Sequence, residues 1–189
     1  MALTEQMQGQ GTWLFKHRGV LPLIIFVIGA GLFLKNESSP ENWILKEEVQ
    51  HYLYELCCLI VSFIGFFIRI YTVGYSRPNT SGRNTSQQVA DELNTTGIYS
   101  IVRNPLYVGN FFMWLGIALL TGNFWFIIAF ILFYFLYYER IIFTEEQFLK
   151  NKFGDTYSNW ATKTPIIVPK FSSFIKSEYS FNWKKVLRQ

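Results

Sequence analysis

The stretch Leu106–Phe143, LYVGNFFMWLGIALLTGNFWFIIAFILFYFLYYERIIF, decides the fold. It holds two apolar runs, Leu106–Leu120 and Phe124–Phe143, which are separated only by Thr121-Gly122-Asn123. Three turn-forming residues between two apolar helical runs predict a tight antiparallel helical hairpin. The second run has the roughly 20 residues that a helix needs to cross a bilayer core of about 30 Å. The stretch therefore predicts a hairpin inside a membrane.

Two further apolar runs precede the hairpin, at about Val20–Leu34 and Tyr52–Tyr71. Of the 189 residues, 50% are hydrophobic and only 16% are charged, whereas a soluble domain carries about 25% charged residues. We expect an all-α fold, a polytopic transmembrane helix bundle of about four spans whose third and fourth helices form the hairpin. The first and third runs are short, so they would need flanking residues or a thinner bilayer to span.

Charged residues between the runs predict the orientation. Lysines and arginines gather before the first run, in the loop 72–103 and in the tail after Phe143, whereas acids dominate the segment 35–50. The positive-inside rule then places the N-terminus, the loop 72–103 and the C-terminal tail in the cytoplasm. The net charge of +4 fits such flanks better than nucleic-acid binding. The first run follows Arg18 without a small-residue cleavage site, so no cleavable signal is expected.

Metal binding is not expected. The cysteines are the adjacent pair Cys57 and Cys58 inside an apolar run, and the histidines, His17 and His51, lie far apart. Two neighbouring cysteines do not make a metal site.

Polar groups flank the hairpin at both ends. Asn104 and Pro105 are suited to the cap and first position of a helix, and the helix start beside Arg103 could bind a carboxylate or phosphate. Arg140 and the pair Glu145-Glu146 end the second run. Taken alone, each group is explained at least as well by a snorkelling side chain or a solvated helix turn as by a binding site. The hairpin, however, returns all of them to one membrane face.

The segment Leu93-Asn94-Thr95-Thr96-Gly97-Ile98-Tyr99-Ser100-Ile101-Val102-Arg103-Asn104-Pro105-Leu106-Tyr107-Val108-Gly109 resembles the signature of the isoprenylcysteine carboxyl methyltransferase and phospholipid methyltransferase superfamily. The later residues Glu145-Glu146, Phe153-Gly154, Tyr157, Pro165 and Pro169 are similar in order and spacing. The resemblance covers about residues 91 to 170. It implies a membrane-embedded methyltransferase that binds S-adenosylmethionine in a cytoplasmic pocket closed by the tail, with a lipid substrate entering from the bilayer.

The resemblance also assigns site residues by position. The cofactor site would be lined by Leu93, Thr95, Tyr99, Arg103, Asn104, Pro105, Tyr107, Glu145 and Glu146. Arg140 lies within one residue of the arginine that binds the substrate anion in the family. Arg103 and Arg140 are expected to be catalytic. Arg69 and Arg140 are expected to bind the substrate. Three parts are expected: N-terminal helices and polar loop over residues 1–90, the methyltransferase core over 91–170, and a basic, aromatic tail over 171–189.

One departure from the signature bears on the acceptor, because Asn104 stands where the family usually has histidine. Asparagine cannot titrate near neutral pH. An ionised oxygen acid needs no base, whereas an amine does, so we expect methyl transfer to an anionic oxygen. The stretches Arg69–Tyr75 and Thr80–Asn84 resemble bacterial members, including lipid A phosphate methyltransferases. That favours a lipid phosphate over a prenylcysteine carboxylate, and a bacterial inner membrane.

Two other functions fit the same residues. Membrane sterol or enone reductases that use a nicotinamide cofactor resemble the chain at the R-x-P-x-Y-x-G motif and in the tail, but they are usually much longer. A non-enzymatic membrane scaffold would leave the converging charges of Arg103, Arg140, Glu145 and Glu146 unexplained.

Overall fold

The computed structural model describes residues 2–38, 48–77 and 88–188, and within these it is helical apart from loops and one isolated bridge. The predicted all-helical fold is therefore confirmed for the described residues. The Thr80–Asn84 stretch and most of the acidic segment 35–50 lie outside them. The helices are α1 (Leu3–Lys16), α2 (Val20–Glu37), α3 (Glu48–Tyr75), η2 (Ile98–Ser100), α4 (Pro105–Leu120), α5 (Phe124–Phe153), α6 (Asp155–Ala161), η3 (Phe171–Ser173) and α7 (Trp183–Leu187).

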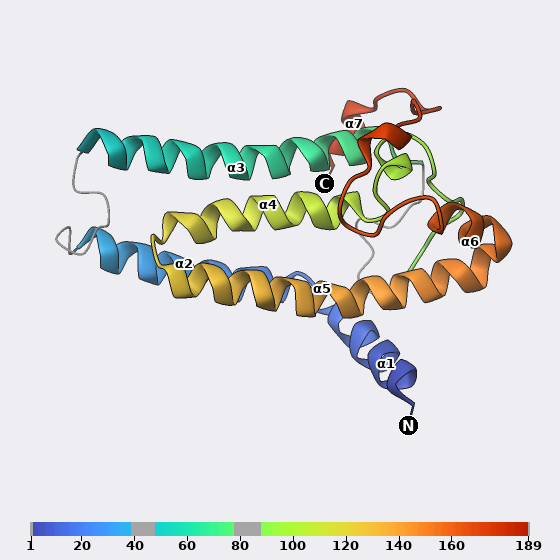
Figure 1. Cartoon of the computed structure of the whole chain (residues 1–189), viewed down its shortest axis with the longest axis horizontal. Helices are drawn as coiled ribbons and strands as arrows, with labels where there is room; N and C mark the ends of the chain where they lie inside the picture. The colour runs from blue at the N-terminus through green and yellow to red at the C-terminus, as the bar shows by residue number, and fades with distance from the viewer. Residues whose placement is uncertain (1, 39–47, 78–87, 189) are drawn as a thin grey trace.

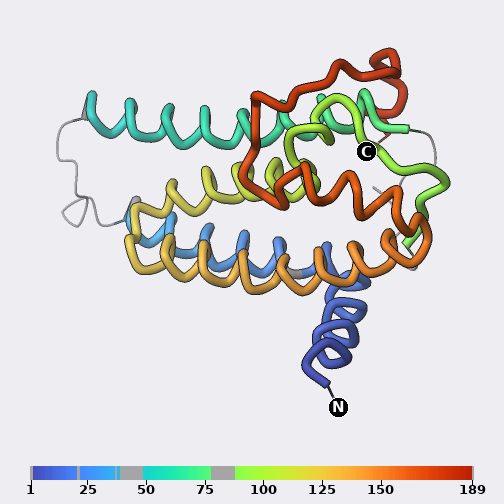
Figure 2. The backbone as a smooth tube through the Cα atoms, turned by 45° about the vertical axis from the view of Figure 1, so that its right-hand side comes forward, coloured from blue at the N-terminus to red at the C-terminus, as the bar shows by residue number. Residues whose placement is uncertain are grey.

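Helices α2 to α5 run side by side along the long axis of the molecule (Figures 1 and 2). The start of α2, the end of α3, the start of α4 and the end of α5 lie at one end, together with α6 and α7. Within the described parts of the chain, two helices, Val49–Tyr75 and Phe124–Phe153, have the length and apolar composition to cross a membrane, and Pro22–Asn36 and Pro105–Leu120 are shorter apolar helices.

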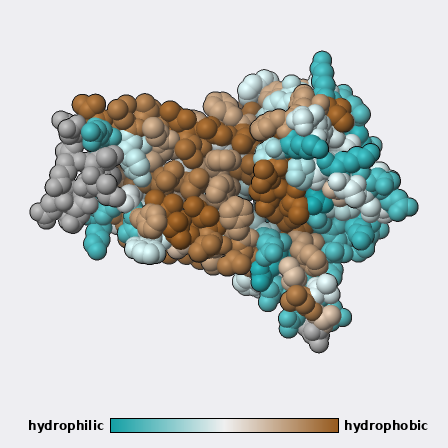
Figure 3. Space-filling view, viewed as in Figure 1, coloured by the Kyte–Doolittle hydropathy of each residue, from teal (hydrophilic) through white to brown (hydrophobic). Residues whose placement is uncertain are grey.

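On the face that Figure 3 shows, an apolar band covers the middle of the bundle, and hydrophilic side chains cover the end that carries α6 and α7. Large apolar side chains stay exposed along the band, among them Leu23, Val27, Leu59, Phe63, Phe67, Trp125, Leu132 and Leu136. In water such a surface would be costly, whereas in lipid it needs no cover. The band therefore fits a membrane-embedded bundle.

The tightest helix pair is α3 with α4, rather than the hairpin α4 with α5. Glycines cause this close approach, because a Cβ added at Gly65 or Gly116 would collide with the backbone of the facing helix. Ser62 adds a hydrogen bond across the pair, from Oγ to the Met113 carbonyl at 3.0 Å. Small residues of this kind let membrane helices pack backbone to backbone. The sequence pattern had emphasised the hairpin, and it missed this pair.

The hairpin turn itself is as short as predicted, since α4 ends at Leu120 and α5 begins at Phe124. Gly122 takes a φ of 60°, which side chains rarely tolerate. The Asn123 side chain accepts a hydrogen bond from the Phe126 N–H at 2.9 Å and so caps α5.

The N-terminal helix α1 was not predicted. It leaves the bundle at an angle (Figure 1) and packs against α5. Gly11 lies so close to Arg140 and Thr144 that a Cβ would collide with both. Phe15 is buried, and its ring lies 4.1 Å from the Arg18 guanidinium carbon. Helix α1 therefore fixes Arg18 at the start of α2.

We predict that Gly116→Ala destabilises the protein, because the new methyl group would meet Ser62 and the Cys58 carbonyl on α3. Overpacking of this kind costs about 1–3 kcal/mol. The melting midpoint in detergent, followed by tryptophan fluorescence, should fall. Gly31→Ala is the matched control, because nothing lies within 4 Å of its added Cβ. Equal midpoints for the two variants would contradict the close α3–α4 contact.

Candidate active site

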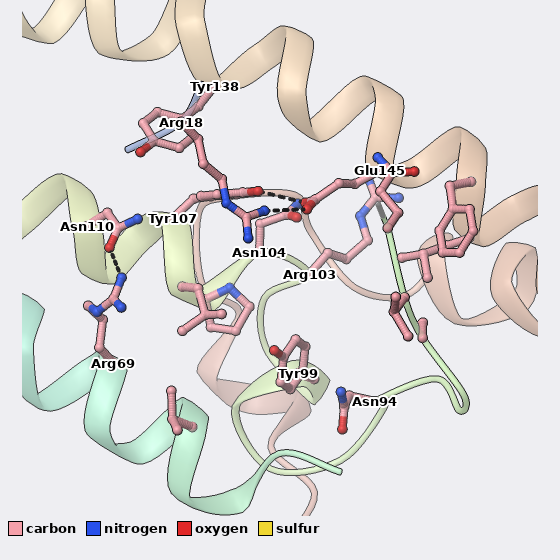
Figure 4. A pocket seen from close by; sticks show the side chains of 18 of the residues that line it. Arg18, Arg69, Asn94, Tyr99, Arg103, Asn104, Tyr107, Asn110, Tyr138 and Glu145 are labelled. Atoms are coloured by element: carbon pink, nitrogen blue, oxygen red, sulfur yellow. Dashed lines mark hydrogen bonds and ion pairs between the residues drawn. The ribbon is translucent and has the colours of Figure 1, made fainter. Parts of the chain in front are cut away.

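A cavity of about 620 Å³ opens at the hydrophilic end of the bundle. Helices α3, α4 and α5, the start of α2 and the loop before η2 all contribute to its walls. Its volume is within the range of about 300–1,000 Å³ that is usual for small-molecule sites. Figure 4 shows the polar side chains that point into it.

Glu145 on α5 is the central acid of the cavity (Figure 4). Its Oε2 accepts a hydrogen bond from the Tyr107 hydroxyl at 2.9 Å, and its Oε1 lies 3.8 Å from Arg18 Nη1. Tyr107 is held in turn by Tyr134, whose hydroxyl donates to the Tyr107 carbonyl at 2.7 Å. Tyr107 on α4 and Arg18, in the turn before α2, thus hold the carboxylate of Glu145 on α5.

A second charged group, beside the first, joins Arg103, Glu146 and Tyr157. Arg103 Nε lies 3.3 Å from Glu146 Oε1, although the two atoms are not aligned for a hydrogen bond. Burial, reinforced by the Glu146 carboxylate, raises the pKa of Tyr157, so its hydroxyl stays a neutral donor. The ion pair between Arg103 and Glu146 connects the start of α4 to the last part of α5, as the hairpin predicts.

Backbone hydrogen bonds bring the chain that follows α5, called the tail from here on (residues 154–188), onto the signature loop (residues 93–104). The Arg103 N–H donates to the Pro165 carbonyl at 2.8 Å, and the Lys170 N–H donates to the Ile101 carbonyl at 2.9 Å. The Asn104 side chain joins them, since its Nδ2 donates to the Ile166 carbonyl at 3.2 Å. Helix α4 begins at Pro105 as expected, but Asn104 makes no side-chain cap and instead holds the tail.

The tail also secures the floor of the cavity around Tyr99. Trp160 Nε1 donates to the Tyr99 carbonyl at 3.1 Å, and Gly97 forms an antiparallel bridge with Ile175. Burial raises the pKa of Tyr99, with a smaller contribution from Glu145. Further along, the Asn182 N–H donates to the Gly74 carbonyl at 3.0 Å. Trp160 and Val186 from this part of the chain also line the cavity.

Arg69 enters the cavity from α3 (Figure 4), and its Nη1 donates to Asn110 Oδ1 on α4. Gly109 makes room for this side chain, because a Cβ there would lie 2.7 Å from Arg69 Cγ. The glycine that ends the signature motif is therefore explained by the arginine that it faces.

The structure gathers most of the residues assigned from sequence, and separates a few. The cavity is lined by Arg69, Leu93, Tyr99, Arg103, Asn104, Pro105, Tyr107 and Glu145. Thr95 and Glu146 lie outside this lining. Arg140 is placed on the α1 side of α5, where its Nε donates to Gln10 Oε1 at 2.9 Å and its Nη1 lies 3.3 Å from Glu139.

Sequence reasoning missed Arg18, Asn94, Asn110 and Tyr138, which also line the cavity. Arg18 had been counted only as a cytoplasmic flank. Asn110 carried a signal that could have been used, since it is a polar residue inside an apolar run.

Residues 55–156, more than half of the chain, match the family of phospholipid methyltransferases. The chain belongs to the phospholipid methyltransferase family. The matched residues include the signature loop, the α4–α5 hairpin, Arg103 and the Glu145–Glu146 pair, whereas Arg18 and Tyr157 lie outside the match. This membrane methyltransferase family therefore accounts for most of the cavity walls.

Curated relatives agree in part with this family assignment. The protein-S-isoprenylcysteine O-methyltransferase of Schizosaccharomyces pombe is 40% identical over 96 residues, which are 47% of this chain and 40% of that enzyme. The cobalt-zinc-cadmium resistance protein CzcN of Cupriavidus metallidurans is 33% identical, covering 86% of this chain and 68% of the relative. The nickel-cobalt-cadmium resistance protein NccN of Alcaligenes xylosoxydans xylosoxydans is 28% identical, covering 90% and 72%.

The names of the last two relatives refer to metal resistance. Among the residues that the structure describes here, no group of three or more His, Cys, Asp or Glu side chains could hold a metal ion.

For this methyltransferase family member we predict that Gly74→Ala loosens the tail, because the new methyl group would collide with the Phe181 ring. Amide exchange at Asn182, whose N–H is bonded to Gly74, should quicken by about tenfold or more. Hydrogen exchange with mass spectrometry on residues 175–187 measures this. Gly9→Ala, with nothing near its Cβ, should leave the same peptides unchanged. Unchanged exchange in Gly74→Ala would mean that the tail does not depend on this contact.

Proposed function

We propose that the protein transfers the methyl group of S-adenosylmethionine to an anionic oxygen of a membrane lipid or lipidated substrate. Membership of a membrane methyltransferase family supports the reaction type. The observation that carries the proposal is that the signature residues Tyr99, Arg103 and Tyr107 line the same cavity as Glu145, which comes from α5 of the hairpin.

The cavity suits a cofactor that carries an ammonium group, a carboxylate, hydroxyls and an aromatic base. The Glu145 carboxylate can accept hydrogen bonds from an ammonium group or a ribose. Arg103, beside the start of α4, can bind a carboxylate. The rings of Tyr99, Tyr107 and Trp160 line the same space and can contact a base or a cationic sulfonium. In volume and donor set, the residues present fit S-adenosylmethionine.

When bound, S-adenosylmethionine supplies a methyl group on a sulfonium, and it leaves as a neutral thioether once the acceptor oxygen has taken that methyl. The protein's own task is then to hold donor and acceptor in line and to exclude water. The tail, through Trp160 and Pro165, covers the signature loop and so restricts access of water. None of the described residues that line the cavity is a histidine, which supports an acceptor oxygen that is already ionised.

The acceptor would enter from the bilayer. Phe66, Ile70, Met113 and Trp114 belong to the apolar helices α3 and α4 and also line the cavity. Lys16, Arg18, Arg77 and Arg103 lie at or near the same end of the bundle, so we place the cavity on the cytoplasmic side of the membrane, in bacteria the inner membrane.

We predict that Glu145→Gln weakens binding of S-adenosylmethionine by about tenfold or more, because a neutral amide replaces the acceptor of charge-assisted hydrogen bonds. Calorimetric titration of the protein in detergent measures the dissociation constant. Glu139→Gln is the matched control on the same helix, since Glu139 faces Arg140 outside the cavity.

A nicotinamide cofactor is titrated alongside. Binding of that cofactor instead of S-adenosylmethionine would replace the proposal with a reductase, and equal affinity in the two glutamate variants would remove Glu145 from the cofactor site.

A further inference from the structure

Arg69 differs from the other two arginines that line the cavity. Arg18 lies 3.8 Å from Glu145, and Arg103 lies 3.3 Å from Glu146. Among the described residues, no carboxylate lies within ion-pair distance of Arg69, whose hydrogen-bond partner is the neutral side chain of Asn110. Among the residues that the structure describes, Arg69 is thus the cavity-lining guanidinium without an acid partner.

The position of Arg69 in the membrane makes the absence of an acid partner energetically costly. It lies inside the apolar helix α3, with Phe66 and Ile70 as neighbours along the cavity wall. A charged side chain within a membrane helix is expensive, and such residues usually face a cavity and pair with an opposite charge. The stem of Arg69 also packs against Gly109, at the point where Gly65 and Gly109 let α3 and α4 approach closely. The packing therefore presents the guanidinium to the cavity and limits its movement to the surface.

The two ends of the cavity differ in character. Tyr99, Arg103 and Asn104 come from the signature loop and the adjoining start of α4, where polar groups gather. The lining on the Arg69 side includes the apolar Phe66, Met113 and Trp114 beside the polar Asn110 and Tyr138. A cation without an acid partner next to apolar walls is complementary to an amphiphile that carries one anionic group on a hydrocarbon chain.

We propose that Arg69, oriented by Asn110, binds the anionic headgroup of the methyl acceptor, a phosphate or carboxylate on a lipid chain. This inference rests on the proposed methyltransferase function and names its acceptor site. Asn110 Oδ1 takes one N–H of the guanidinium, which leaves its other N–H groups for the anion. The geometry assigns this role to Arg69 rather than to Arg140, because Arg140 is engaged with Gln10 and Glu139 on the α1 side of α5.

The test measures binding of simple amphiphiles to the full chain in dodecyl maltoside. Dodecyl phosphate and dodecanoate are titrated by calorimetry, with dodecanol as the uncharged probe. The wild type should bind at least one anion and discriminate against dodecanol. Arg69→Gln should weaken anion binding by about tenfold or more, Arg69→Lys should weaken it less, and Arg140→Gln should leave it unchanged. The anion that binds more tightly identifies phosphate or carboxylate as the acceptor chemistry.

Asn110→Asp supplies a second, independent variant. It keeps the shape of the side chain and gives Arg69 the acid that it lacks, so the protein should remain folded while anion binding falls by about tenfold or more. The melting midpoint of each variant, followed by tryptophan fluorescence, reports folding. Anion affinity that is unchanged in folded Asn110→Asp or Arg69→Gln, or that falls in Arg140→Gln instead, would overturn the proposal.

Titration of S-adenosylmethionine separates this proposal from the one on which it rests. Arg69→Gln should bind it as the wild type does, because Arg69 lies with the apolar part of the cavity. If no variant and no wild-type protein binds S-adenosylmethionine, the methyltransferase proposal fails while the anion data still decide the role of Arg69. If the cofactor binds but dodecyl phosphate, dodecanoate and dodecanol bind alike, the acceptor site alone is wrong.

Discussion

The backbone contact between α3 and α4 is the constraint on which the rest of the structure depends. Gly65, Gly109 and Gly116 remove the side chains that would otherwise separate the two helices. In lipid, apolar side chains gain nothing by leaving the solvent, so close packing and interhelical hydrogen bonds must hold the bundle together. The same contact sets the position of Arg69, and the start of α4 positions the signature loop. Packing and site geometry are thus consequences of one helix pair.

The cavity shows how charge is accommodated at the edge of a membrane. Arg18 and Arg103 each face a glutamate from the end of α5, and tyrosine hydroxyls from α4 and α6 surround these acids. The charges are paired where the tail and the loops cover them. Of the described arginines that line the cavity, Arg69, beside the apolar helices, has no acid partner among the described residues. A ligand that brings its own negative charge would balance this guanidinium.

The tail acts as part of the site, although it is distant in sequence from the signature loop. Its backbone pairs with Gly97, Ile101 and Arg103, and Asn104 contributes a side-chain hydrogen bond to the same seam. In this chain the position that the family signature usually fills with histidine therefore has a structural task. The division into a core at 91–170 and a final segment at 171–189 stays a prediction, and the bridge between Gly97 and Ile175 connects the two parts.

The sequence by itself determined the helical class, the short turn at Gly122 and the meeting of Arg103 with the Glu145–Glu146 pair, because apolar run length and turn residues act locally. The signature motif also pointed to Tyr107 and Gly109, and a charged residue within an apolar run pointed to Arg69. Only the tertiary structure decided that α3 is the main partner of α4, that α1 brings Arg18 to the cavity, and that Arg140 faces away from it. Those outcomes depend on which face of each helix meets a neighbour, and a helix of apolar residues on all sides carries no periodic signal that reveals this.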